Sequence, residues 1–364
     1  MHRVVSCCFL WLFAVCSAAA QDRVTYLDRS SKTGATLLKS GTITGEDPGK
    51  VTLSFGDARR SDVPVSDVID IAYDGEPTAE MNSARAAERE RKYDVALAGY
   101  TDALKKSPSD KKLLRRHLEY KIAEMRTAQA DAGVNPAAAL DALRQFIKAH
   151  PDSRQSLTAY DNLGRLLVIA RQPVNEVVEA LAGVRSKYGT DSKEVANRCD
   201  LLRSDLILQD LELTAQKDGM DAAKGKAAIA AKAIAELVTI ADRSAQPDLL
   251  ARQTYCQAIS NPAAATVAAW EAQLKATDDH HSRAGIHLTR GDYYRLMQNY
   301  KEAMWDYLWV DTVYFADRHQ QARALSQLID VFDKLGDATK SKDCKERLQN
   351  DGRLRDTRQA KAAK

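Results

Sequence analysis

The chain has 364 residues, of which 45% are apolar and 28% charged, and its 53 Lys and Arg against 50 Asp and Glu give a formal charge of +3. These proportions exclude a disordered acidic chain and a strongly basic nucleic-acid-binding protein. Only 17 Gly and 9 Pro are present, which disfavours a sandwich of many short strands and favours helices. We therefore expect a mainly helical protein of two or three domains or one repeat array.

Residues 1–20 have the pattern of an export signal. A short basic region, Met1–Arg3, precedes an apolar run, Val4–Cys16, and a small-residue cleavage site, Ala18–Ala20. The apolar run is shorter than the roughly 20 residues that span a bilayer, and no later stretch is continuously apolar over that length. We predict cleavage before Gln21, no transmembrane segment in the mature chain, and export to the periplasm or the outside.

Three of the six cysteines lie in this signal, so the mature chain keeps Cys199, Cys256 and Cys344. An odd number without paired spacing predicts neither a disulfide framework nor a zinc site. We expect these cysteines to be buried in helices as small apolar side chains, with a single disulfide as the alternative.

Residues 22–76 have the pattern of a small β domain. Segments rich in β-branched residues are separated by Gly, Asp, Pro and Ser, which is typical of short strands joined by turns. Val51, Leu53 and Phe55 alternate with polar residues, as in a strand with one buried face, and Glu46–Gly49 has the composition of a tight turn. The predicted strands cover 24–27, 36–44, 51–55, 63–65 and 68–73. Their order resembles Sm-like and SH3-like barrels, so we expect a small curled barrel.

Many Sm-like barrels bind RNA, but the charge of this segment disfavours that function. The segment carries ten acidic and seven basic residues, a net charge of −3, which repels phosphate. It also has no basic loop with an aromatic residue on which a base could stack. We expect a packing or partner-docking module that binds no nucleic acid.

The strand pattern ends near residue 76, and a different motif follows at 91–108. There Tyr93, Ala96, Tyr100, Ala103 and Pro108 alternate aromatic and small residues before a proline that ends the helix. This segment resembles a tetratricopeptide repeat (TPR), a helix-turn-helix unit of about 34 residues. Ala84 stands where the motif usually has Gly.

A second segment, 288–307, is similar to the same motif. Gly291, Tyr294, Tyr300, Ala303 and Tyr307 follow the order and spacing of the repeat. Small residues let two helices approach closely while the aromatic rings fill the space beside them.

The rest of the chain up to residue 350 consists of weaker helical segments, with apolar residues three and four apart bounded by Pro, Gly, Asn or Asp. They cover 136–150, 160–170, 173–188, 192–216, 222–241, 248–258, 262–276 and 318–334, with a last helix from the turn at 335–337 to 348. The sequence therefore predicts about seven hairpins in a TPR-like α-solenoid over 77–350. Residues 352–364 carry a net charge of +4, and we expect a solvated, disordered tail over 351–364.

In tetratricopeptide proteins, the inner face of each first helix commonly holds the bound peptide. The resemblance therefore implies candidate partner-binding residues on the first helix of both good repeats, with a solvated helix face as the alternative. These candidates are Met81, Arg85 and Arg89 in the first repeat, and Leu288, Asp292 and Arg295 in the second. The Lys and Asn residues with which some members clamp a peptide carboxylate are absent.

Trp305 and Trp309 are further candidates for partner binding. They are four residues apart and thus share one helix face, which lies off the packing stripe of Ala303 and Tyr307. If exposed, they would form an aromatic docking surface. The alternative, which we expect, is that they pack against the following hairpin.

The sequence contains no motif of a zinc protease, a phosphate-binding loop or a serine hydrolase. Asp278–His281 offers carboxylate and imidazole groups, but adjacent loop residues rarely converge on a metal ion. We therefore expect no catalytic, cofactor or metal site. The predicted function is that of an exported, non-enzymatic scaffolding protein that binds protein partners in the cell envelope. The alternative is an envelope glycan-binding or enzyme-accessory protein.

Overall fold

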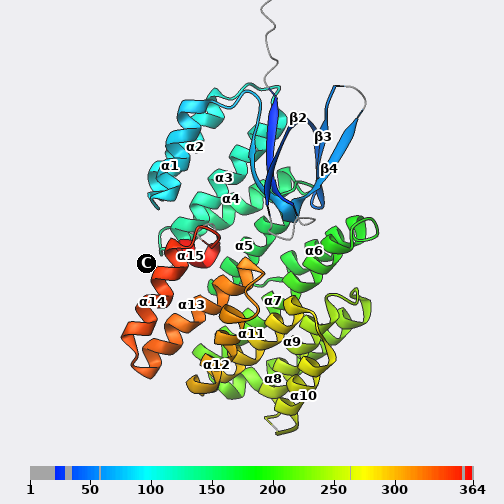
Figure 1. The fold of residues 1–364 in the computed structure, drawn as a ribbon, viewed down its shortest axis with the longest axis vertical. Helices are drawn as coiled ribbons and strands as arrows, with labels where there is room; N and C mark the ends of the chain where they lie inside the picture. Colours follow the sequence, from blue (N-terminus) through cyan, green and yellow to red (C-terminus); the bar gives the residue numbers. More distant parts are fainter. Residues whose placement is uncertain (1–20, 29–34, 57–58, 263, 355–356, 363–364) are drawn as a thin grey trace, which may run out of the picture.

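The computed structural model describes residues 21–28, 35–56, 59–262, 264–354 and 357–362. A five-stranded antiparallel sheet precedes a series of helices that pack in sequential pairs, as Figure 1 shows. The chain is therefore mainly helical, as predicted. The predicted signal, 1–20, lies outside the described residues. Among the described helices, none combines the length and apolar character needed to cross a membrane.

The predicted strands form at the expected places. They are β1 (Asp22–Leu27), β2 (Thr36–Glu46), β3 (Lys50–Ser54), β4 (Arg60–Pro64) and β5 (Val68–Ala72), arranged in the order β4-β3-β2-β1-β5. The turn between β2 and β3 is held by the Asp47 carboxylate, which accepts hydrogen bonds from the backbone N–H of Gly49 at 2.7 Å and of Lys50 at 3.0 Å. This is the tight turn expected from its composition.

The sheet is open, so the prediction of a barrel is corrected. The first half of β2 pairs with β1 and its second half with β3, with a register shift between Ile43 and Gly45, but the outer strands β4 and β5 do not pair with each other. The first helices cover the inner face instead, because Val24 and Val51 of the sheet share one apolar cluster with Met81 and Leu118. Burial against helices removes the need for closure.

A buried carboxylate joins the sheet to the helices. Glu46, at the end of β2, accepts a hydrogen bond from the Tyr73 hydroxyl at 2.6 Å and from Arg116 at 2.5 Å, and Arg154 lies 3.4 Å away. Its side chain is fully buried. Charged hydrogen bonds at a buried site are strong and directional, so the sheet is an integral part of the helical array.

Fourteen described helices form the seven predicted hairpins. They are α1 (Thr78–Arg89), α2 (Tyr93–Lys106), α3 (Lys112–Asp131), α4 (Pro136–Ala149), α5 (Ser156–Ile169), α6 (Asn175–Tyr188), α7 (Lys193–Asp218), α8 (Met220–Ile240), α9 (Gln246–Ser260), α10 (Ala264–Ala276), α11 (His280–Leu296), α12 (Tyr300–Thr312), α13 (Arg318–Leu335) and α14 (Ala338–Asn350). The predicted bounds of α4, α7, α8 and α13 agree within two residues. Gly219, with φ of 93°, joins α7 to α8 in a conformation that favours glycine.

The residues that carry the TPR resemblance pack as expected. Ala96 and Tyr100 in α2 and Ala303 and Tyr307 in α12 are all fully buried. The Tyr100 hydroxyl donates to Glu88 of α1 at 2.6 Å, and the Tyr307 hydroxyl donates to Asp292 of α11 at 2.7 Å. The two hairpins therefore share one packing arrangement.

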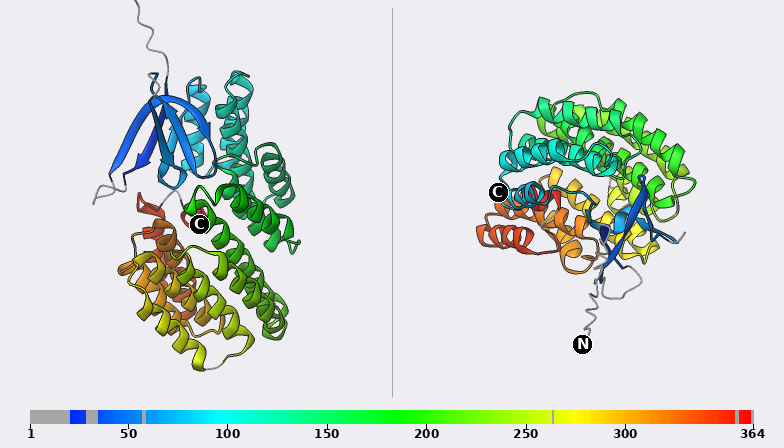
Figure 2. Two further views of the ribbon diagram at one scale, coloured as in Figure 1. Left: turned by 90° about the vertical axis from the view of Figure 1, so that its right-hand side faces the viewer. Right: turned by 90° about the horizontal axis from the view of Figure 1, so that it is seen from above.

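The C-terminal segment folds back onto the array, which differs from the solvated tail predicted over 351–364. A short helix, α15 (Arg358–Ala362), contacts α13, α14 and α3. Leu354 and Ala360 are buried, and Arg91 donates to the Ala360 carbonyl at 2.7 Å. The last helices thus return beside the first ones, as Figures 1 and 2 show.

Candidate functional site

The candidates on the first helices of the two good repeats are mostly engaged within the protein. Met81 and Leu288 are buried core residues. Arg85 forms an ion pair with Glu76 at 3.1 Å, while Arg89 is exposed. Three of these four side chains already have partners inside the fold.

Asp292 and Arg295 belong to a buried polar network between α7, α11 and α13. Asp292 accepts hydrogen bonds from Tyr307 and Arg323, and Arg295 pairs with Glu212 of α7 at 3.3 Å. Burial raises the pKa of Glu212, and the nearby Asp292 adds to that shift.

The network continues toward α9. Asp205 of α7 lies 3.1 Å from Arg252 of α9 and 3.8 Å from Arg323 of α13. A ligand that binds along these helices would have to displace intramolecular ion pairs, which leaves buried charges unpaired. The arrangement therefore favours a structural role for this face.

The two tryptophans are more exposed than we expected for side chains that pack against the following hairpin. Trp305 is 59% exposed and Trp309 is 45% exposed. Val313 and Phe315, which follow on the same stretch, are exposed as well. We call these four residues the α12 patch. Exposed large apolar side chains, when they lie close together, are typical of interaction sites.

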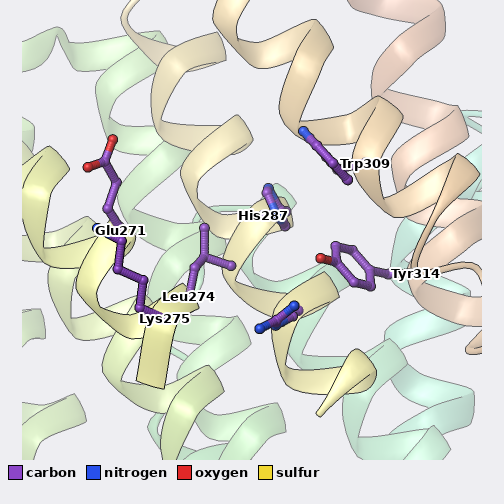
Figure 3. Close-up of a pocket in the computed structure, with 7 residues that line it drawn as sticks. Glu271, Leu274, Lys275, His287, Trp309 and Tyr314 are labelled. Carbon is purple, nitrogen blue, oxygen red and sulfur yellow. The ribbon is translucent and has the colours of Figure 1, made fainter. Parts of the chain in front are cut away.

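A pocket of about 340 Å³ lies beside the α12 patch, between α10 and α12, with α11 as its floor. Figure 3 shows side chains of α10 on one side, Trp309 and Tyr314 on the other, and His287 between them. The lining residues are Glu271, Leu274, Lys275, Arg283, His287, Trp309 and Tyr314. Aromatic and aliphatic walls with a few polar groups are typical of ligand sites.

Three aromatic rings line this pocket with similar orientations. The ring centroid of His287 lies 5.8 Å from Trp309 and 5.5 Å from Tyr314, with interplanar angles of 18° and 24°. The ring of Tyr314 also meets His280 edge-on at 5.4 Å. The rings support one another, so the aromatic wall is formed before any ligand arrives.

A buried carboxylate fixes the orientation of His287. Nδ1 of the ring lies 2.8 Å from Oδ1 of Asp306, and Arg290 donates to both oxygens of that carboxylate at 2.7 to 3.1 Å. Both His287 and Asp306 are buried. The pair holds the imidazole in one position at the floor of the pocket.

The acidic and histidine residues at the start of α11 are used to join helices. Asp279 caps α11 by accepting from the Ser282 N–H at 2.8 Å. His281 lies 3.2 Å from Asp317, which caps α13, and 3.8 Å from Asp248 of α9. No group of three or more metal-ligating residues gathers anywhere in the described ranges.

These charges shift one another's pKa values. The hydrogen bond that His281 donates to Asp317 raises the pKa of His281 against the effect of burial. Burial would raise the pKa of Asp317, but the hydrogen bond from His281 outweighs it and brings the pKa to about 2. Burial raises the pKa of Asp248 to about 6.

The three cysteines are free and buried, which agrees with the first of the two predicted alternatives. Burial raises the thiol pKa of Cys199 and of Cys256 to about 12, and that of Cys344 to about 11. The thiols therefore stay protonated at neutral pH and are poor nucleophiles.

No protein-family model and no curated protein matches this chain. The TPR resemblance therefore depends on the packing residues of the two hairpins, α1/α2 and α11/α12.

Sequence reasoning missed His287 and the pocket around it. A signal was present, because Arg283, His287 and Arg290 recur on one face of α11 at intervals of four and three residues. Polar side chains that recur on one face of a packed helix predict polar contacts with a neighbouring helix, and here His287 and Arg290 contact Asp306 of α12.

Proposed function

We propose that this protein is an exported, non-enzymatic scaffolding protein with a TPR-like α-solenoid, and that it binds a protein partner on the α12 patch. The site differs from the inner-face position that the TPR resemblance implies. Arg85, Asp292 and Arg295 are held in internal ion pairs or hydrogen bonds, whereas the α12 patch is open.

The exposure of Trp305 and Trp309 carries this proposal. Tryptophan supplies large contact areas and is enriched among the residues that contribute most to binding free energy. Two of them on one helix face, followed in the chain by the exposed Val313 and Phe315, leave apolar side chains that a partner can cover.

An envelope glycan-binding function is the alternative. The observation that favours it is the wall of near-parallel rings, His287, Trp309 and Tyr314, in a pocket of about 340 Å³. Flat aromatic faces can stack on sugar rings. The scaffold proposal is preferred because the apolar surface extends beyond the pocket to Trp305 and Val313.

Replacement of both tryptophans of the α12 patch tests the proposal. The double variant Trp305→Ala/Trp309→Ala is expected to lose a partner that the unchanged protein captures from an envelope fraction, because each truncation at such a site costs about 2 kcal/mol or more in binding free energy. Site-specific photocrosslinking from position 305 identifies the protein in contact with the patch.

The matched control is Ile229→Ala, which removes an apolar side chain of α8 that is even more exposed than the two tryptophans. Capture should persist in this variant. Capture that survives the double tryptophan substitution, or that is lost equally in the control, would refute the proposed site. Retention of envelope glycan without any protein would favour the alternative.

A further inference from the structure

We propose that the pocket between α10 and α12 binds a tyrosine or tryptophan side chain of the partner, whose O–H or N–H donates a hydrogen bond to Nε2 of His287. This inference rests on the proposed function, because it names the chemistry of the partner at the same surface.

The first argument is the hydrogen-bonding state of His287. Asp306 is buried, and Arg290 donates to both of its oxygens. An ionised carboxylate held by a guanidinium only accepts hydrogen bonds, so Nδ1 of His287, 2.8 Å away, must donate to it. With this hydrogen on Nδ1, the neutral form of the ring carries its lone pair on Nε2, which is then the acceptor that the proposal uses.

The second argument is the lack of a partner for that acceptor. His287 is only 5% exposed and lines the pocket. Within the described part of the chain, the one hydrogen bond of its ring is the contact of Nδ1 with Asp306. A ligand with a correctly placed donor can therefore form the hydrogen bond that no described side chain forms with Nε2.

The third argument is the shape and lining of the pocket. Trp309 and Tyr314 face Leu274 across the cavity, as Figure 3 shows. Aromatic walls favour an aromatic ring, because offset and edge-on ring pairs add to the free energy of area burial. The volume of about 340 Å³ lies at the small end of ligand pockets, which suits one side chain. A ring with an O–H or N–H donor can pack against the aromatic walls and also donate a hydrogen bond to His287 at the floor of the pocket.

The rim adds a charge preference. Arg283 is held by the Thr277 carbonyl at 2.7 Å and by Asp278 at 2.9 Å. Lys275 is exposed and forms no ion pair with any described residue, and Glu271 is the one anion of the lining. An acidic residue next to the aromatic one in the partner would therefore pair with Lys275.

Binding of small probes to the full-length protein tests the hypothesis. N-acetyltyrosinamide, N-acetyltryptophanamide and N-acetylphenylalaninamide are titrated while the indole N–H signal of Trp309 is followed by NMR. The tyrosine and tryptophan probes should shift this signal saturably. The phenylalanine probe should bind roughly threefold to tenfold more weakly, because it lacks the donor for one hydrogen bond.

One variant separates the hydrogen bond from the ring contacts. His287→Phe keeps a ring and removes the acceptor, so the three probes should then bind alike. Ile229→Ala on α8 is the control and should behave as the unchanged protein. Acetyl-Asp-Tyr-amide should bind more tightly than acetyl-Asn-Tyr-amide, and Lys275→Gln should remove that difference.

Three results would overturn the inference, and none of them needs a variant. These are equal binding of all three probes to the unchanged protein, an unchanged Trp309 signal, and a saturable response to glucose or N-acetylglucosamine without one to the amino-acid amides. Partner capture is measured separately. Capture lost while probe binding remains refutes the proposed function alone, and capture retained without probe binding refutes the pocket proposal alone.

Discussion

At the scale of single residues, the two TPR-like hairpins show why particular small residues stand at particular positions. Gly291 of α11 packs against the buried ring of Tyr307, and a Cβ at this position would lie 2.8 Å from Cε1 of that ring. In α1/α2 the equivalent position is Ala84, and space is made by Gly99, where a Cβ would lie 2.9 Å from that of Ala84. The missing glycine of the first repeat is thus compensated on the opposite helix.

We predict that Gly291→Ala destabilises the protein by about 1 to 3 kcal/mol, because the added methyl group overpacks a buried aromatic contact. The matched control is Gly225→Ala in α8, where a Cβ would meet nothing within 4 Å. The control should gain about 0.5 to 1 kcal/mol from the higher helix propensity of alanine. Urea unfolding measures both, and a stabilised Gly291→Ala would contradict the packing argument.

Asp248 makes the stability of the folded protein depend on pH. Burial raises its pKa from 3.8 to about 6, although Arg252 and His281 act in the opposite direction. The folded protein therefore binds this proton more tightly than the unfolded chain does. The contribution of this proton to the free energy of unfolding is complete below about pH 4 and is lost as the pH rises through 6.

Asp248→Asn should remove this dependence. We expect the variant to be more stable than the unchanged protein at pH 7.5, by up to about 3 kcal/mol at 1.4 kcal/mol per pKa unit, and the difference to shrink near pH 4.5. Asp317→Asn is the opposite case, because the pKa of Asp317 is lowered to about 2 and its charge stabilises the fold at both pH values. Denaturant unfolding at pH 4.5 and 7.5 measures these differences. A net loss of stability for Asp248→Asn confined to pH 7.5 would contradict the prediction.

At the scale of elements, the sheet and the first helices depend on each other. Their side chains form one apolar cluster, and Glu46 links β2 to Arg116 of α3 and to Arg154 before α5. Deletion of 22–76 would therefore expose the apolar faces of α1 to α3. Single substitutions at the junction are the better way to examine the role of the sheet.

Glu46→Gln is expected to destabilise the protein by about 3 to 5 kcal/mol, because it leaves two buried guanidinium groups without their counter-charge. Asp62→Asn in β4 is the control, because the ion pair of Asp62 with Lys50 is about half exposed on both sides and such pairs contribute about 0 to 1 kcal/mol. Thermal unfolding compares the two variants. Equal losses would show that the Glu46 cluster does not link the elements energetically.

At the scale of the whole molecule, the C-terminal segment changes the shape of the array. A series of hairpins is open at both ends, but here α15 contacts α3, and Arg358 lies 3.6 Å from Asp161 of α5. The ends of the array are thereby joined. The partner site that we propose differs from this joined region, because it includes Trp305 and Trp309 of α12, which are exposed.

The sequence by itself determined the helical class, the positions of most helices and strands, and the packing residues of the two good hairpins. These properties follow from local patterns, since apolar periodicity and turn residues act over a few positions. Tyr100 and Tyr307, for example, are buried as their spacing predicts.

Only the tertiary structure decided whether the sheet closes, where the C-terminal segment lies and which helix faces stay exposed. These properties depend on elements far apart in the chain, as the contact between Arg91 and Ala360 shows. Trp309 is a second example. Its spacing in the sequence predicts the helix face on which it lies, but it does not predict whether a later helix covers that face. The packing of α12 against α11 and α13 leaves it beside His287 at an open pocket.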